Sequence, residues 1–343
     1  MFEIRKEFKQ AHPDLIEKIN KSDYSFLYEN EHLGDRIILL TLGGSFSYGL
    51  NNKDSDLDIR GIALHSKEEL LGTSNFEQFI NNETDTVIYS ISKFISLASQ
   101  CNPNIIEILG CRNEDYLYIS PLGQLLLDNK DLFLSQRAID NFSAFAYAQL
   151  KRIRSATIRD RIDADELNKY LISSLQSAYA NLETQLELDK YGKFNLFYDD
   201  IDKEIKVDVN FNKLPQNEII SIANCLKQVK ENYTKTMGKN KRKDDAHLNK
   251  HCMHLYRLLC MGLELCLDNT INVYRKDREL LLKIRSGYYM NSDGLIDEKF
   301  YELVDNKFKE IEENRASCML PKKPNQKLIE NLLIKINEET LGL

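Results

Sequence analysis

The sequence predicts an α+β protein with two domains, an α/β domain over residues 1–135 and a mainly helical domain over residues 136–343. Two observations indicate this fold class. In the first part of the chain, short apolar runs typical of buried strands alternate with helical segments. Beyond about residue 135, apolar residues recur almost everywhere at the three- and four-residue spacing of helices. A chain of 343 residues is also long enough for about two domains.

The predicted strands of the first domain follow a helical lead-in over residues 1–34. The helical period returns at Ser92, and Asn102-Pro103 then predicts the start of a helix over Asn104–Gly110. Asparagine is a favoured N-cap residue, and proline fits the first helical position. The three strands are predicted at Arg36–Leu42, Leu57–Leu64 and Thr84–Ser90.

The second domain is predicted to consist mainly of helices. Lys193–Val209 is less regular and is compatible with a short hairpin, and Gly238–Asp245 is a polar, basic loop. A last helix is expected after Pro321–Pro324. The other helices are predicted at Asn141–Arg154, Asp165–Leu188, Asn217–Thr236, Leu248–Cys266 and Asp297–Glu313.

Composition and charge exclude several classes of protein. Hydrophobic residues make up 42% of the chain, which is typical of a globular protein. A net charge of -7 argues against an entirely basic nucleic-acid-coating protein, but it allows a local basic groove. No apolar run reaches the ~20 residues of a membrane span, and the charged N-terminus lacks a signal-peptide stretch. The seven cysteines contain no Cys-x-x-Cys pair. We therefore expect a cytoplasmic protein with reduced thiols and no membrane partner.

The segment from residue 43 to residue 61 carries the clearest functional signal. The first predicted strand ends at Gly43-Gly44-Ser45, where glycines let the backbone approach a ligand closely. Exposed amides at such a turn suit phosphate oxygens, and Ser45 adds a hydroxyl. After a short connection comes Ser55-Asp56-Leu57-Asp58-Ile59-Arg60-Gly61 at the start of the second strand.

The spacing of the two aspartates predicts a cation site. Side chains two residues apart on a strand point to the same face, so Asp56 and Asp58 face one way while Leu57 and Ile59 pack into the core. Two adjacent carboxylates need a cation or a proton, and Mg²⁺ is the usual cation beside phosphates. Arg60 shares their face and could contact phosphate or a carboxylate. The alternative, surface carboxylates on an edge strand, explains Asp-x-Asp alone but not the whole combination.

This combination resembles the signature of nucleotidyltransferases of the DNA polymerase β superfamily, and in particular a bacterial and phage group associated with RNA repair. Thr84–Ile91, Asn102–Glu107 and Leu281–Gly287 also resemble that group. The resemblance implies a mixed sheet in the first domain and a helical domain that binds nucleotide or substrate. It further implies three metal-binding carboxylates, of which the third is Asp85, with Glu83 as the competing candidate. They would hold two Mg²⁺ ions, with Mn²⁺ as the alternative metal.

The resemblance also implies a reaction. An acceptor hydroxyl attacks the α-phosphate of an NTP bound through Gly44 and Ser45, and pyrophosphate leaves. An RNA 3′ end is the preferred acceptor, and a hydroxyl of a protein or a small molecule is the alternative. A catalytically silent nucleotide sensor is the non-enzyme alternative. Such a protein would typically lack one of the two Asp-x-Asp carboxylates, whereas this chain keeps both.

Cationic side chains in the helical domain are further candidates for phosphate binding. Lys250, His254 and Arg257 are spaced by four and three residues, which places them on one helix face. They could hold a triphosphate, although an ordinary solvated face explains them equally well. Tyr48 could stack on a base or pack behind the glycine turn. A basic cluster could steer RNA, and it comprises Lys235, Lys239, Lys241, Arg242 and Lys243.

Overall fold

The computed structural model describes residues 2–53, 55–161, 191–199, 204–216, 219–220, 222–223, 227 and 245–343. The chain forms two compact units. The first combines Met1–Lys151 with Asn249–Leu343, and the second is Arg152–Leu248. The predicted domain boundary at residues 135 and 136 falls inside the first unit and stays a prediction. None of the helices in the described ranges is long and apolar enough to cross a membrane.

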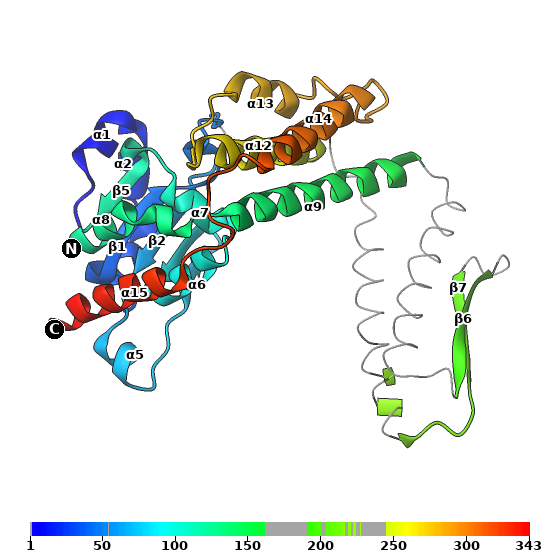
Figure 1. The fold of residues 1–343 in the computed structure, drawn as a ribbon, viewed down its shortest axis with the longest axis horizontal. Helices are drawn as coiled ribbons and strands as arrows, with labels where there is room; N and C mark the ends of the chain where they lie inside the picture. The colour runs from blue at the N-terminus through cyan, green and yellow to red at the C-terminus, as the bar shows by residue number, and fades with distance from the viewer. Residues whose placement is uncertain are drawn as a thin grey trace. The chain divides into compact units, whose positions relative to one another are not determined.

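A five-stranded sheet organises the first unit, and β1, β2 and β5 of this sheet are labelled in Figure 1. The order of its strands is β3-β4-β2-β1-β5. β2 and β4 are parallel, whereas the other neighbouring pairs are antiparallel. The sheet is therefore mixed, and together with the helical C-terminal part of the chain it confirms the predicted α+β fold class. The strands are β1 (Ile37–Leu42), β2 (Ile59–Ala63), β3 (Gln78–Asn81), β4 (Thr86–Ser90) and β5 (Tyr116–Ile119).

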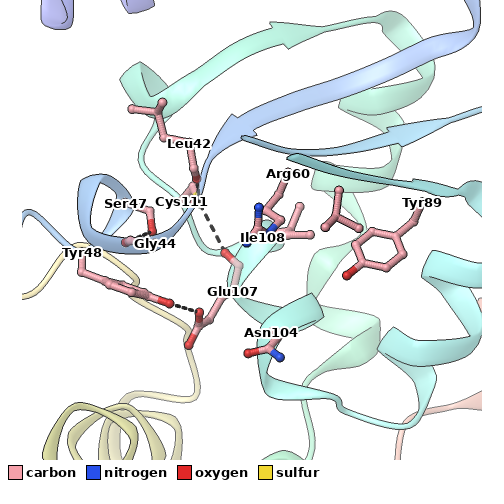
Figure 2. Close-up of a pocket in the computed structure, with 12 residues that line it drawn as sticks. Leu42, Gly44, Ser47, Tyr48, Arg60, Tyr89, Asn104, Glu107, Ile108 and Cys111 are labelled. Carbon is pink, nitrogen blue, oxygen red and sulfur yellow. Dashed lines mark hydrogen bonds between the residues drawn. The ribbon is translucent and has the colours of Figure 1, made fainter. Parts of the chain in front are cut away.

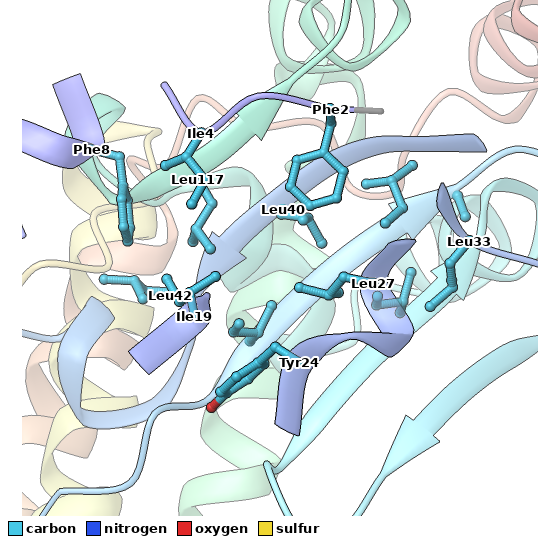
Figure 3. Close-up of a cluster of buried hydrophobic side chains, with 14 of the residues drawn as sticks. Phe2, Ile4, Phe8, Ile19, Tyr24, Leu27, Leu33, Leu40, Leu42 and Leu117 are labelled. Atoms are coloured by element: carbon cyan, nitrogen blue, oxygen red, sulfur yellow. The ribbon is translucent and has the colours of Figure 1, made fainter. Parts of the chain in front are cut away.

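Short N-terminal helices cover one face of this sheet and enclose a hydrophobic core (Figure 3). Phe8 and Leu27 come from this segment and meet Leu42, Ile59 and Ile88 of three strands, and all five side chains are fully buried. Burial of such apolar area, at roughly 25 cal/mol per Å², is the main contribution to the stability of this layer. The helices are α1 (Lys6–Ala11), α2 (Pro13–Ile19) and α3 (Phe26–Glu29).

Helices that follow the strands contact the sheet elsewhere and complete the first part of the chain. α6 contacts β2 and β4, and α8 contacts β1 and β5. The Asn102 side chain caps α7 by accepting a hydrogen bond from the Asn104 amide, and Pro103 is the first residue of that helix, as the sequence predicted. The helices are α4 (Gly44–Ser47), α5 (Lys67–Leu71), α6 (Ile91–Ser99), α7 (Pro103–Leu109) and α8 (Pro121–Asp128).

Four of the five remaining described helices are long, as the three- and four-residue spacing of their apolar residues predicted, whereas the helix Arg278–Arg285 has 8 residues and was not among the predicted helices. The last of them, α15, contacts α6 of the sheet region and so ties the C-terminus to it (Figure 1). The predicted helix Asp165–Leu188 lies outside the described residues, as does most of Asn217–Thr236. The helices are α9 (Gln136–Arg161), α12 (Asp245–Asp268), α13 (Arg278–Arg285), α14 (Glu298–Arg315) and α15 (Gln326–Leu341).

The second unit contains an antiparallel hairpin in its described part. β6 (Gly192–Asp199) pairs with β7 (Glu204–Phe211) along the full length of both strands. The rings of Phe194 and Phe211 meet edge to face, with centroids 5.0 Å apart. The predicted short hairpin at Lys193–Val209 therefore lies within this pair of strands, each of which has 8 residues.

Candidate active site

The parallel pairing of β2 and β4 brings two aspartates side by side. Ile59 is opposite Thr86 in the register. The residues that immediately precede the two strands, Asp58 and Asp85, therefore lie side by side. Leu57 and Ile59 are buried in the core below the sheet. Because side chains alternate along a strand, Asp58 is directed to the opposite face, as the sequence predicted.

The glycine turn after β1 lies directly against Asp58. The Gly43 amide donates a hydrogen bond to the Asp58 carbonyl oxygen at 2.8 Å, which extends the pairing of β1 and β2. Gly44 has a φ of +55° and begins α4. A Cβ added to Gly44 would stand 1.6 Å from Oδ2 of Asp58. Only glycine fits residue 44, because the conformation is left-handed and the carboxylate occupies the space of a side chain.

The carboxylates act on one another. Burial, followed by the charge of the nearby Asp85 and a side-chain hydrogen bond with it, raises the pKa of Asp58 to about 6. Asp56 contributes in the same direction, whereas Arg60 lowers this pKa. Asp56 is itself exposed, two residues before Asp58. The three aspartates thus form one concentration of negative charge at the end of the sheet.

Arg60 supplies the positive charge at this place. Its guanidinium donates hydrogen bonds to the backbone carbonyl oxygen of Asp85 and, at 3.2 Å, to Oδ1 of the same residue. The side chain is 23% exposed, while that of Asp85 is 60% exposed. Ion pairs of this exposure contribute little to stability. The arrangement therefore points to a role in the site rather than in the fold.

The donor set fits a divalent cation. Hard cations such as Mg²⁺ take carboxylate oxygens as ligands. The raised pKa of Asp58 reflects burial first and then repulsion by Asp85, and a bound cation would offset both. The carboxylates do not form a closed cluster, since the described residues contain no group of three His, Cys, Asp or Glu side chains gathered for a metal. Asp56 and Asp85 are exposed. The more buried Asp58 is therefore the fixed member of the set.

A pocket of about 230 Å³ opens beside the carboxylates, between the glycine turn, the sheet and α7 (Figure 2). Arg60 lines it from β2, and Val87 and Tyr89 line it from β4. Its other lining residues are Leu42, Gly43, Gly44, Ser47, Tyr48, Asn104, Glu107, Ile108 and Cys111.

Comparison with known families agrees with this geometry. Residues 15–171 match the model of the RNA repair pathway DNA polymerase beta family (RlaP). Over these residues, which make up less than half of the chain, the chain is similar to this family. The matched range contains the whole five-stranded sheet, the glycine turn and the three aspartates. The match agrees with the resemblance found in the sequence and supports a nucleotidyltransferase of the polymerase β type in an RNA repair pathway. No curated protein matches the chain.

A buried network joins the part of the chain that matches the family model to α12. Glu107 of α7 accepts hydrogen bonds from the Tyr48 hydroxyl at 2.5 Å and from Nη1 of Arg257 at 2.6 Å (Figure 2 shows the first). The Arg257 guanidinium also lies over the Tyr48 ring, 3.7 Å from its centroid. All three residues are buried. Tyr48 therefore packs behind the glycine turn, which decides between the two predicted roles of this residue.

The predicted row of three cations on α12 needs correction. Arg257 is 4% exposed and paired with Glu107, so its charge is neutralised within the protein and is not available to a triphosphate. Burial and the charge of Arg257 lower the pKa of His254 to about 3, so this side chain is neutral at pH 7. Lys250 is exposed and remains a cation. The three residues lie on one helix, α12, as predicted, but Arg257 and His254 are inside the protein.

The other predicted site residues have different surroundings. Ser45 is half-buried in α4, and its carbonyl oxygen accepts a hydrogen bond from the Leu50 amide at 2.8 Å. Glu83 is exposed in the turn before β4, where its amide donates to Asn81. Asp85, not Glu83, is therefore the acidic residue beside Asp58 in the register. The predicted basic cluster at residues 235–243 lies outside the described residues.

Sequence reasoning missed Tyr89 and the role of Glu107. One signal for Glu107 was present, since it is the only charged residue in the helix Pro103-Asn104-Ile105-Ile106-Glu107-Ile108-Leu109. A single carboxylate on an otherwise apolar helix is usually either paired or functional. Tyr89 carries no comparable signal, because a tyrosine is common in any half-buried strand.

Proposed function

We propose that this protein is a divalent-metal-dependent nucleotidyltransferase that transfers an NMP from an NTP to the 3′ hydroxyl of an RNA. The observation that carries the proposal is the register of β2 and β4, which sets Asp58 beside Asp85 next to the glycine turn. A pocket at the same place offers room for part of a substrate. The match to the RNA repair family model supports both the reaction class and the RNA acceptor.

Asp56, Asp58 and Asp85 would hold the metal, proposed as two Mg²⁺ ions with Mn²⁺ as a substitute. When bound, the ions neutralise charge on the phosphates and stabilise the attacking and leaving oxygens. Asp58 is fixed by the sheet and by its contact with Gly44. The more exposed Asp56 and Asp85 can adjust to the substrate, and Gly44 and Ser45 place backbone amides at the phosphates.

The proposed step is an in-line displacement at the α-phosphorus. The acceptor hydroxyl oxygen forms a bond to phosphorus, and the bond from phosphorus to the bridging oxygen of the β-phosphate breaks. Pyrophosphate leaves with that electron pair, and Asp85 accepts the hydroxyl proton. Arg60 already contacts Asp85 and can contribute positive charge to the phosphates. Catalysis of this kind depends mainly on positioning and on electrostatic stabilisation.

The test is transfer of label to RNA. The purified full-length protein would be incubated with Mg²⁺, total cellular RNA and each α-³²P-labelled NTP in turn, and the products separated on a denaturing gel. The matched variants are Asp58→Asn, which keeps the size of the side chain, and Asp305→Asn, which removes an exposed carboxylate from α14.

We expect label on a discrete RNA with the wild type and with Asp305→Asn, and none with Asp58→Asn. Label on a protein or small molecule would keep the transferase activity and overturn the RNA acceptor. Full activity of Asp58→Asn would show that the proposed site is wrong.

A further inference from the structure

The pocket beside the carboxylates is continuous with the glycine turn. Gly43 and Gly44 form one side of it, and Tyr89 of β4 and Asn104 of α7 form another (Figure 2). Its volume of about 230 Å³ is below the ~300–1,000 Å³ of pockets that hold a whole drug-sized ligand. It can therefore take one part of a nucleotide, while the rest lies over the turn and the carboxylates.

Most polar side chains that line this pocket already have partners. Both carboxylate oxygens of Glu107 accept hydrogen bonds, from Tyr48 and from Arg257. The Ser47 hydroxyl donates to the carbonyl oxygen of Gly44 at 2.9 Å. The Cys111 thiol donates to backbone carbonyl oxygens, including that of Glu107 at 3.4 Å. These groups shape the pocket, but they do not offer free hydrogen-bonding capacity to a ligand.

Tyr89 and Asn104 are the exceptions among the lining residues. Within the described ranges, neither the Tyr89 hydroxyl nor the Asn104 amide group makes a hydrogen bond, and both side chains are drawn toward the pocket in Figure 2. A hydroxyl and an amide can each donate and accept. Together they offer a neutral set of donors and acceptors on two walls of one pocket.

The rest of the lining indicates which part of a nucleotide fits. Leu42, Val87 and Ile108 provide apolar surface. Glu107 is neutralised by Arg257, and the lining contains one cation, Arg60, which is bound to Asp85 at the side of the carboxylates. Apolar walls with a few neutral polar groups suit a nucleobase, whereas a triphosphate needs several positive charges or free amides.

We propose that Tyr89 and Asn104 bind the base of the incoming NTP and determine which nucleotide is used. This inference rests on the proposed function. Gly43 and Gly44 line the same pocket, so an NTP with its phosphates on the glycine turn has its base within reach of β4 and α7. An acceptor nucleotide would have no such connection to the turn, which is why we assign the pocket to the NTP.

The experiment measures binding without turnover. Isothermal titration with Mg²⁺ and no RNA would give the affinity of the full-length protein for the α,β-methylene analogues of the four NTPs and for inorganic tripolyphosphate. The variants are Tyr89→Phe and Asn104→Ala, which each remove only the polar group. The matched controls are Tyr147→Phe and Asn331→Ala, at exposed places on α9 and α15.

We expect the wild type to discriminate among the four analogues. Each pocket variant should weaken the preferred analogue by about tenfold, corresponding to ~1.4 kcal/mol for one hydrogen bond to a ligand, and reduce the discrimination. The affinity for tripolyphosphate and the affinities of the control variants should stay unchanged.

Three results would overturn the inference while leaving the proposed function intact. One is equal affinity of the wild type for all four analogues, and another is unchanged binding by both pocket variants. The third, from a separate titration with RNA in place of the nucleotides, is a loss of RNA affinity in the pocket variants with no loss of NTP affinity, since it would assign the pocket to the acceptor. A wild type that binds neither the analogues nor tripolyphosphate would instead overturn the proposed function, and this inference with it.

Discussion

The carboxylate of Asp58 occupies the space that a side chain of residue 44 would need: a Cβ added to Gly44 would stand 1.6 Å from Oδ2 of Asp58. The placement of Asp58 therefore depends on the absence of a side chain at Gly44. The requirement for glycine comes from this contact as well as from the φ of +55°.

Gly44→Ala is expected to reduce transfer roughly 100-fold, because it must displace Asp58 by a distance on the order of 1 Å. The control is Gly342→Ala, since Gly342 has a φ of +73° with nothing within 4 Å of the added Cβ. Both variants incur backbone strain of ~1–2 kcal/mol, and Gly44→Ala has the additional cost of the clash with Asp58. Only Gly44→Ala should lose Mn²⁺ binding, measured by titration calorimetry. Equal transfer rates in the two variants would contradict the assigned contact.

The repelled carboxylate of Asp58 predicts a pH-dependent stability of the metal-free protein. Burial, followed by Asp85, raises the pKa of Asp58 from 3.8 to about 6. Folding therefore takes up a proton between about pH 4 and pH 6, so the stabilisation present at low pH is lost as the pH rises through 6. Since Asp58 is partly solvated, the loss is on the order of 1–2 kcal/mol.

Asp58→Asn should accordingly raise the melting temperature at pH 7.5 by about 2 °C in the presence of EDTA, because the buried amide carries no charge and is not repelled by Asp85. At pH 4 the variant and the wild type should melt alike. Mg²⁺ should stabilise the wild type at pH 7.5 but not the variant. A melting temperature for Asp58→Asn below that of the wild type at both pH values would contradict the repulsion.

The ion pair between Arg60 and Asp85 predicts competition between an internal cation and the metal. Arg60→Gln removes the guanidinium and leaves the aspartates unneutralised. Mn²⁺ should then bind more tightly in the absence of nucleotide, whereas the KM for NTP should rise about tenfold through the loss of a phosphate contact. Calorimetry and steady-state kinetics test the two effects separately. Weaker Mn²⁺ binding in Arg60→Gln would show that Arg60 instead holds Asp85 in place for the metal.

Local sequence patterns predicted the elements that position the site. The strand ending at Gly43-Gly44, the strand after Asp-x-Asp and the helix that begins at Pro103 all occur close to their predicted bounds. The short strands β3 and β5 were not predicted, because four residues are too few to show the alternation of a strand. Their stability comes from pairing with β4 and β1, which the local sequence does not reveal.

Long-range pairing could not be predicted in the same way. The spacing of Lys250, His254 and Arg257 defines one helix face, but it does not tell whether water or protein lies against that face. The answer depends on Glu107, 150 residues away from Arg257 in the sequence. Polar residues on a predicted helix therefore indicate a face, and only the tertiary structure indicates its partner.

The ion pair between Glu107 and Arg257 predicts strong coupling. Its two side chains are 10% and 5% exposed. Removing one member leaves the other charge buried without a partner, which typically costs ~3–5 kcal/mol, whereas removing both avoids that cost. Arg257→Met should therefore lower the urea midpoint sharply. Adding Glu107→Gln should restore much of the loss, with a coupling energy of ~2–3 kcal/mol.

The exposed pair Lys309 and Glu313 provides the control for this cycle. Its side chains are 74% and 61% exposed, so Lys309→Met should change stability by no more than about 0.5 kcal/mol. If the losses of Arg257→Met and Glu107→Gln simply add in the double variant, the two residues do not stabilise each other. The bond from Glu107 to Tyr48 would then have to hold α7 against the glycine turn without help from α12.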